Sequence, residues 1–139
     1  MSLIPSPIVS ASPDETERIG TQIGQAMQPG DVIALYGDLG AGKTHLTRGI
    51  CAGMGGEADH VSSPTFALVQ TYGTDPPLHH IDAYRRIGGD ELLWDDGVCI
   101  VEWPSRIEAL LPSHTVRLLL THRPDGSRQV EQVEHAPDR

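Results

Sequence analysis

Apolar residues recur along this chain with two different spacings, and each spacing predicts a different element. In residues 13–27 they recur at every fourth position, which places them on one face of a helix: Ile19, Ile23 and Met27. Ser12 is expected to cap this helix, with Pro13 in the first helical position. Glu15 completes a capping box, in which its carboxylate should reach back to the backbone N–H of Ser12.

Short, continuous apolar runs predict buried strands. Residues 32–36 form the first run and precede a second helix over residues 44–54. Residues 98–101 form another run, followed by a short helix over residues 104–111, and a further short helix is predicted around residues 90–94. Strands that alternate with helices are typical of a sheet with helices on its faces.

The other predicted strands pair as hairpins. Strands over residues 66–72 and 78–81 flank one turn, and strands over residues 115–121 and 128–134 flank another. Partners in a hairpin are antiparallel, so the sheet is expected to be mixed.

The length of 139 residues is that of one compact domain. This domain is predicted to span residues 10–134, after an N-terminal segment of residues 1–9 and before a disordered tail of residues 135–139.

A glycine-rich run lies between the first predicted strand and the second helix. It matches the phosphate-binding pattern G-x-x-x-x-G-K-[ST] at every position: Gly37, Asp38, Leu39, Gly40, Ala41, Gly42, Lys43 and Thr44. Backbone N–H groups of such a loop face a polyphosphate, and the helix N-terminus adds partial positive charge. Lys43 would reach the β- and γ-phosphates, and the Thr44 hydroxyl would bind Mg²⁺. The predicted fold is therefore α/β: a single-domain P-loop NTPase with a mixed parallel and antiparallel sheet flanked by helices.

Charge and cysteine content narrow the function classes. Ten basic and nineteen acidic residues give a net charge of −9, and such a surface repels nucleic acid. Any RNA is therefore expected to be held by another protein. Cys51 and Cys99 are predicted to be buried thiols, which fits a cytoplasmic protein, and no apolar run has the length of a membrane span.

Three residues at or beside strand ends are candidates for chemistry, because ligands of open α/β sheets bind at the carboxyl ends of strands. Asp82 and Glu102 each follow an apolar strand and could hold Mg²⁺ or orient a water molecule, whereas an ordinary turn aspartate or surface glutamate fits the same positions. Thr65 fits either a loop that senses the γ-phosphate or a simple turn. Trp103 fits either a stacking residue or a partly buried anchor.

Four blocks of sequence resemble the TsaE family, the small ATPases of bacterial tRNA threonylcarbamoyladenosine biosynthesis. The blocks cover residues 37–44, 63–66, 80–85 and 101–104, and read GDLGAGKT, SPTF, HIDAYR and VEWP. The combination of the second and fourth blocks is specific to that family, and the resemblance extends over residues 10–112.

The resemblance implies a protein that binds ATP and Mg²⁺ and hydrolyses ATP weakly alone. It would act with threonylcarbamoyl-transfer proteins of the TsaB and TsaD type on adenosine 37, and would meet tRNA only through them. By the same resemblance, Thr44 and Glu102 bind Mg²⁺, Thr65 belongs to a switch loop, and Asp82 acts near the γ-phosphate. The remaining implied nucleotide contacts are Trp103, Pro13 and Arg128.

The chain departs from the family pattern in two places. His45 follows Thr44 where the family usually has a second hydroxyl residue, and the stretch over residues 86–97 is shorter than in the family. The second departure bears on partner contacts more than on nucleotide binding. Two other readings remain open: a P-loop kinase acting on a small molecule, and a nucleotide-dependent switch that does not hydrolyse ATP.

Overall fold

The computed structural model describes residues 4–37, 42–61, 69–83 and 97–137 of the chain. It contains a seven-stranded sheet in the order β1-β7-β6-β2-β5-β4-β3. The strands are β1 (Ile8–Ser10), β2 (Val32–Tyr36), β3 (Val69–Tyr72), β4 (Leu78–Asp82), β5 (Val98–Glu102), β6 (Val116–His122) and β7 (Arg128–Val133). The helices are α1 (Pro13–Gln25) and α2 (Lys43–Gly53), with shorter 3₁₀ segments η1 (Ala58–His60) and η3 (Pro104–Leu110).

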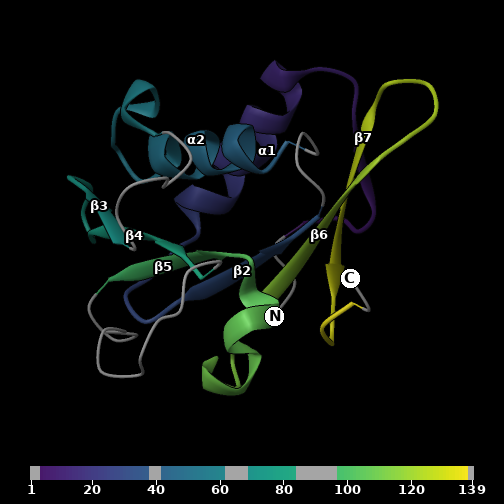
Figure 1. Ribbon diagram of the computed structural model, residues 1–139. Coiled ribbons are helices and arrows are strands. Elements are labelled where there is room, and N and C mark those ends of the chain that lie inside the picture. Colours follow the sequence, from purple (N-terminus) through teal and green to yellow (C-terminus); the bar gives the residue numbers. More distant parts are fainter. Residues whose placement is uncertain (1–3, 38–41, 62–68, 84–96, 138–139) are drawn as a thin grey trace.

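The sheet is mixed, as predicted. Strands β4, β5, β2 and β6 run parallel, whereas β3 is antiparallel to β4, β7 to β6, and β1 to β7. Helices α1 and α2 lie together on one side of the sheet, and the η3 segment after β5, drawn in green, lies on the other (Figure 1). The prediction of a single α/β domain with a mixed sheet is therefore confirmed.

Helix α1 begins where the sequence places its start, with one difference in its cap. The Ser12 side chain accepts the Glu15 N–H at 3.2 Å, and Pro13 takes the first helical position. The Glu15 carboxylate accepts the N–H of Ala11 at 2.7 Å, so the predicted bond to Ser12 was wrong by one residue. Both bonds anchor the chain that leads from β1 into α1.

Close contact between α1 and α2 depends on glycines that face each other. A Cβ added to Gly20 would lie 2.3 Å from the Leu46 carbonyl oxygen, and one added to Gly49 would lie 2.0 Å from the Glu17 carbonyl oxygen. Gly24 and Gly53 repeat this arrangement one turn further along. The backbones can approach this closely only without side chains, so the glycines fix how α2 sits against α1.

The two faces of the sheet bury separate apolar clusters. Side chains under α1 and α2 form the larger one, which includes Ile33 and Leu35 of β2, while Val32 and Val101 belong to a smaller cluster with Ile107 of η3 on the opposite face. This alternation follows from the two-residue period of a strand. The predicted helix over residues 104–111 is a 3₁₀ segment that breaks at Ile107, whose φ is −130°.

Several further predictions bear on the described residues. Cys51 and Cys99 are free and buried, as predicted. None of the described helices has the length and apolar character needed to cross a membrane. The helix predicted around residues 90–94, and residues 66–68 of the predicted strand, lie outside the described residues.

Candidate functional site

Two glycines bracket the predicted phosphate-binding loop and turn the chain from β2 into α2. Gly37 has φ +142°, and an added Cβ would lie 2.5 Å from the Leu120 carbonyl oxygen, so only glycine fits there. Gly42 caps α2 in the left-handed region at φ +100°. Residues 38–41, and with them Asp38, Leu39, Gly40 and Ala41 of the predicted site, lie outside the described residues.

A cavity of about 450 Å³ opens at the N-terminus of α2. Its lining comes from the turn between β1 and α1, the start of α2, the end of β5 and the turn before β7: Ser10, Ala11, Ser12, Pro13, Thr16, Gly42, Lys43, Thr44, His45, Glu102, Gly126 and Arg128. Six of the predicted site residues thus share one cavity: Pro13, Gly42, Lys43, Thr44, Glu102 and Arg128. They come from four separate segments of sequence that the fold brings together.

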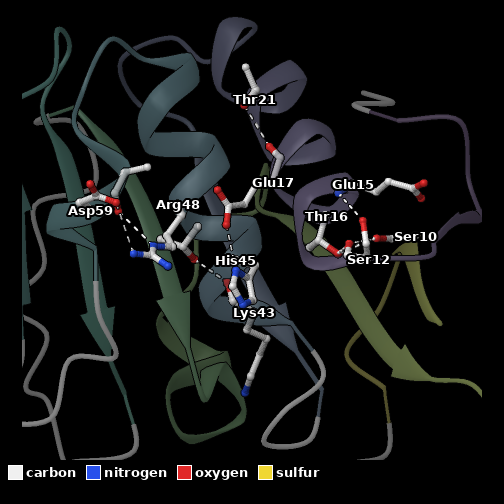
Figure 2. Close-up of polar contacts among 12 residues, drawn as sticks. Ser10, Ser12, Glu15, Thr16, Glu17, Thr21, Lys43, His45, Arg48 and Asp59 are labelled. Carbon is white, nitrogen blue, oxygen red and sulfur yellow. Dashed lines mark hydrogen bonds and ion pairs between the residues drawn. The ribbon is translucent and has the colours of Figure 1, made fainter. Parts of the chain in front are cut away.

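One wall of the cavity is built from hydroxyl groups at the start of α1. The Ser10 and Thr16 hydroxyls lie 2.7 Å apart, and the Ser10 hydroxyl also donates to the Ser12 carbonyl at 2.7 Å (Figure 2). Both side chains are buried, and β1 holds Ser10 in place by pairing with Arg128. Sequence reasoning assigned residues 1–9 to an N-terminal segment and did not predict β1, so it missed this wall.

A second contact joins α1 and α2 at the cavity. His45 Nδ1 lies 2.9 Å from a carboxylate oxygen of Glu17, and the two side chains face each other across the helix pair (Figure 2). His45, the residue after Thr44, therefore has a structural partner on α1.

Lys43 lies beside Trp103 rather than in open solvent. Its Nζ is 4.4 Å from the centroid of the Trp103 ring, and the lysine is only 6% exposed. Trp103 adopts the left-handed conformation, with φ 57° and ψ 46°, which is uncommon for a bulky residue and turns the chain sharply after β5. Both residues line a smaller cavity of about 110 Å³ next to Gly37, so Trp103 adjoins the larger cavity through Lys43.

Asp82 and Glu102 end two neighbouring parallel strands and are paired in register. Both are largely buried, at 9% and 6% exposure. Glu102 lines the larger cavity, whereas Asp82 lies beside it without lining it. Thr65 lies outside the described residues.

A histidine that was not predicted holds Glu102. Nε2 of His80 lies 2.5 Å from Oε2 of Glu102, and the histidine is fully buried. Its position two residues before Asp82 on the same strand puts both side chains on one face. That spacing was visible in the sequence, but the contact with Glu102 also depends on the register of β4 against β5.

The groups around the cavity fit a magnesium ion and a polyphosphate. The Thr44 hydroxyl and the Glu102 carboxylate supply the oxygen ligands that Mg²⁺ prefers. Oε1 of Glu102 forms no hydrogen bond with any residue that the structure describes, so this oxygen can meet a ligand in the cavity. The N-terminus of α2 and Lys43 supply positive charge beside it.

Comparison with known proteins identifies similar chains of one family. A family model described as threonylcarbamoyl adenosine biosynthesis protein TsaE matches residues 10–130. The tRNA threonylcarbamoyladenosine biosynthesis protein TsaE of Treponema pallidum is 37% identical, over 88% of this chain and 96% of its own. The protein of the same name from Bacillus subtilis is 38% identical, over 87% and 80%. A crystal structure of YdiB from Bacillus subtilis superposes with a TM-score of 0.78 at 35% identity, over 91% of this chain and 82% of that one.

Proposed function

The chain belongs to the TsaE family of tRNA threonylcarbamoyladenosine biosynthesis proteins, and from that premise we propose that it is the Mg²⁺-dependent ATPase subunit of this system. The observation that carries the proposal is one cavity in which Lys43, Thr44 and Glu102 meet at the N-terminus of α2. A cation, a hydroxyl and a carboxylate at a helix N-terminus are the groups that a nucleotide triphosphate with its metal ion requires.

The phosphates of ATP would bind against the start of α2. Lys43 would exchange its contact with Trp103 for one with the β- and γ-phosphates. A cation–π contact contributes roughly 0.5–2 kcal/mol, which is comparable with the hydrogen bond to a charged group that replaces it. Trp103 would thus hold the lysine near its working position in the absence of ATP.

The metal ion would be held by Thr44 and by the Oε1 atom of Glu102. When bound, Mg²⁺ neutralises charge that develops on the phosphoryl oxygens during transfer. Asp82, paired in register with Glu102, would act near the γ-phosphate, either by orienting the attacking water or by holding a water of the metal shell. Thr65 would sense the γ-phosphate as part of a switch loop.

The base and sugar of ATP would occupy the other end of the cavity. Pro13, the hydroxyl wall of Ser10 and Thr16, and Arg128 all line this cavity. The Arg128 guanidinium donates to the Gly126 carbonyl at 2.6 Å, which holds it beside the cavity. Pro13 would border the adenine and Arg128 would contact ATP.

Partner proteins would hold the tRNA, because the acidic surface of this chain would repel it. With a net charge of −9, the protein would meet tRNA only through cytoplasmic threonylcarbamoyl-transfer proteins of the TsaB and TsaD type. Weak hydrolysis by the isolated chain would then rise in their presence.

The test is ATP turnover by the purified protein with Mg²⁺, alone and with these partners and tRNA. A slow basal rate that rises with the partners is expected. A rate that partners leave unchanged would contradict the assignment of partners. Phosphorylation of a small-molecule acceptor without partners would favour a kinase, and tight ATP binding without any turnover would favour a non-hydrolysing switch.

A further inference from the structure

A chain of four polar side chains runs from the edge strand β3 to the cavity. The Tyr72 hydroxyl lies 2.9 Å from the Gln70 side-chain oxygen and 3.1 Å from Nδ1 of His80. Nε2 of His80 then lies 2.5 Å from Oε2 of Glu102. The chain crosses β3, β4 and β5, so it joins an edge of the sheet to the proposed metal ligand.

The middle of this chain is sealed from solvent. His80 is 0% exposed, Glu102 is 6% exposed and Tyr72 is 8% exposed. A buried carboxylate without a hydrogen-bond donor is costly, and His80 supplies that donor. The two ring nitrogens of His80 have different partners, Tyr72 and Glu102, which together fix the plane and direction of the ring.

The contact with His80 divides the two oxygens of Glu102 between two tasks. Oε2 accepts the Nε2–H of His80, because an ionised carboxylate can only accept. Oε1 has no hydrogen bond with the described residues, and Glu102 lines the cavity. The carboxylate can therefore present Oε1 to the cavity while His80 holds Oε2.

We propose that His80 is a positioning residue that aims Oε1 of Glu102 at the metal ion, with Tyr72 fixing the His80 ring. This inference rests on the proposed function, in which Glu102 binds Mg²⁺. Hydrogen-bond partners of metal ligands orient those ligands, and their removal typically lowers metal affinity roughly 10- to 100-fold. The ligand from Glu102 is then a single oxygen.

Two substitutions of His80 by residues with amide side chains distinguish a positioning role from a packing role. The side-chain nitrogen of His80→Gln lies near the place of Nε2 and can still donate to Glu102. His80→Asn is shorter, reaches only the place of Nδ1, and leaves Glu102 without its donor. Both variants bury a similar polar group, so a role in stability alone would affect them alike.

The readout is ATP affinity measured by calorimetry with Mg²⁺ and again with EDTA, so that the ratio of the two affinities isolates the metal. For His80→Asn we expect this ratio to fall about 10- to 100-fold, with affinity in EDTA unchanged. For His80→Gln the ratio should stay within about threefold of the wild-type value. Tyr72→Phe, which removes only the hydroxyl, should lower the ratio by a smaller factor.

A second measurement places His80→Asn in the Glu102→Gln background. If His80 acts through Glu102, the histidine substitution should cause no further loss of the ratio there. An unchanged ratio in His80→Asn, equal losses in the Asn and Gln variants, or an equal loss in the Glu102→Gln background would overturn the inference. A wild-type protein whose ATP affinity is indifferent to Mg²⁺ would instead overturn the proposed function, and this inference with it.

Discussion

Two glutamates six positions apart, Glu102 and Glu108, lie on opposite faces of the sheet and differ in how their oxygens are used. Glu108 accepts two N–H groups of Arg117 on Oε1 and the Tyr36 hydroxyl on Oε2, the latter at 2.5 Å. Among the residues that the structure describes, Glu102 accepts only from His80, on Oε2. Yet Glu102 is the more buried of the two, with a side chain 7% exposed against 32% for Glu108.

The comparison separates a structural carboxylate from one that we propose binds a ligand. Burial of a charge costs free energy unless hydrogen bonds and opposite charge offset it. Glu108 meets that condition with both oxygens and with a guanidinium partner. Within the described part of the chain Glu102 meets it with one oxygen only, which leaves the other for the proposed cation.

The largest expected difference between the two glutamates is in ATP turnover. Glu102→Gln should lower steady-state hydrolysis at least about a hundredfold, because the substitution removes the charge that would hold the metal in the proposed site. Glu108→Gln, its matched control, should stay within about threefold of wild type. Equal losses in the two variants would remove the functional distinction between them.

The next difference between the two variants is in the free energy of unfolding, and here Glu108→Gln should cause the larger loss. Glu108→Gln should lower the free energy of unfolding by about 1–2 kcal/mol, because it replaces charge-assisted bonds to a half-buried arginine with neutral ones. Glu102→Gln should leave it unchanged within about 1 kcal/mol, since a poorly compensated charge is removed. Urea unfolding followed by circular dichroism measures both, and a larger loss in Glu102→Gln would contradict the comparison.

The smallest expected effect is on stability at alkaline pH, and it comes from Tyr36, whose hydroxyl donates to Glu108. Burial, and then the hydrogen bond to Glu108, raise the pKa of Tyr36 from 10.0 to about 12. The folded state therefore holds this proton more tightly than the unfolded state, so the contribution is complete below pH 10 and is lost as the pH rises toward 12. The free energy of unfolding, measured against pH, should fall less across that range in Tyr36→Phe than in wild type. An equal fall in the two proteins would contradict the raised pKa of Tyr36.

Much of the fold could be predicted from local signals in the sequence. The Ser12 and Pro13 start of α1, the apolar run of β2 and both hairpins were predicted correctly. Strand β1 was not, because its three residues carry no periodic signal and pair with β7 from the far end of the chain. The facing glycines of α1 and α2 were also missed, since a close helix approach depends on two segments at once.

The candidate site, like the fold, could be predicted only in part. The phosphate-binding motif itself marked Lys43 and Thr44, and strand ends marked Asp82 and Glu102 as candidates whose roles stay predictions. The Ser10 and Thr16 wall depends on β1, and the His80 contact depends on the register of β4 against β5. Neither pairing follows from local sequence, so the residues that support the site required the fold.

The central claim, that the cavity at α2 binds ATP through Lys43 and Mg²⁺, is tested most directly by calorimetric titration of ATP into the wild-type protein and into Lys43→Ala. Wild type should bind ATP with an affinity that Mg²⁺ raises. Lys43→Ala should bind at least about tenfold more weakly, because a bond to a charged phosphate contributes roughly 1.5–3 kcal/mol. ATP binding to Lys43→Ala at the wild-type affinity would show that the nucleotide site lies elsewhere.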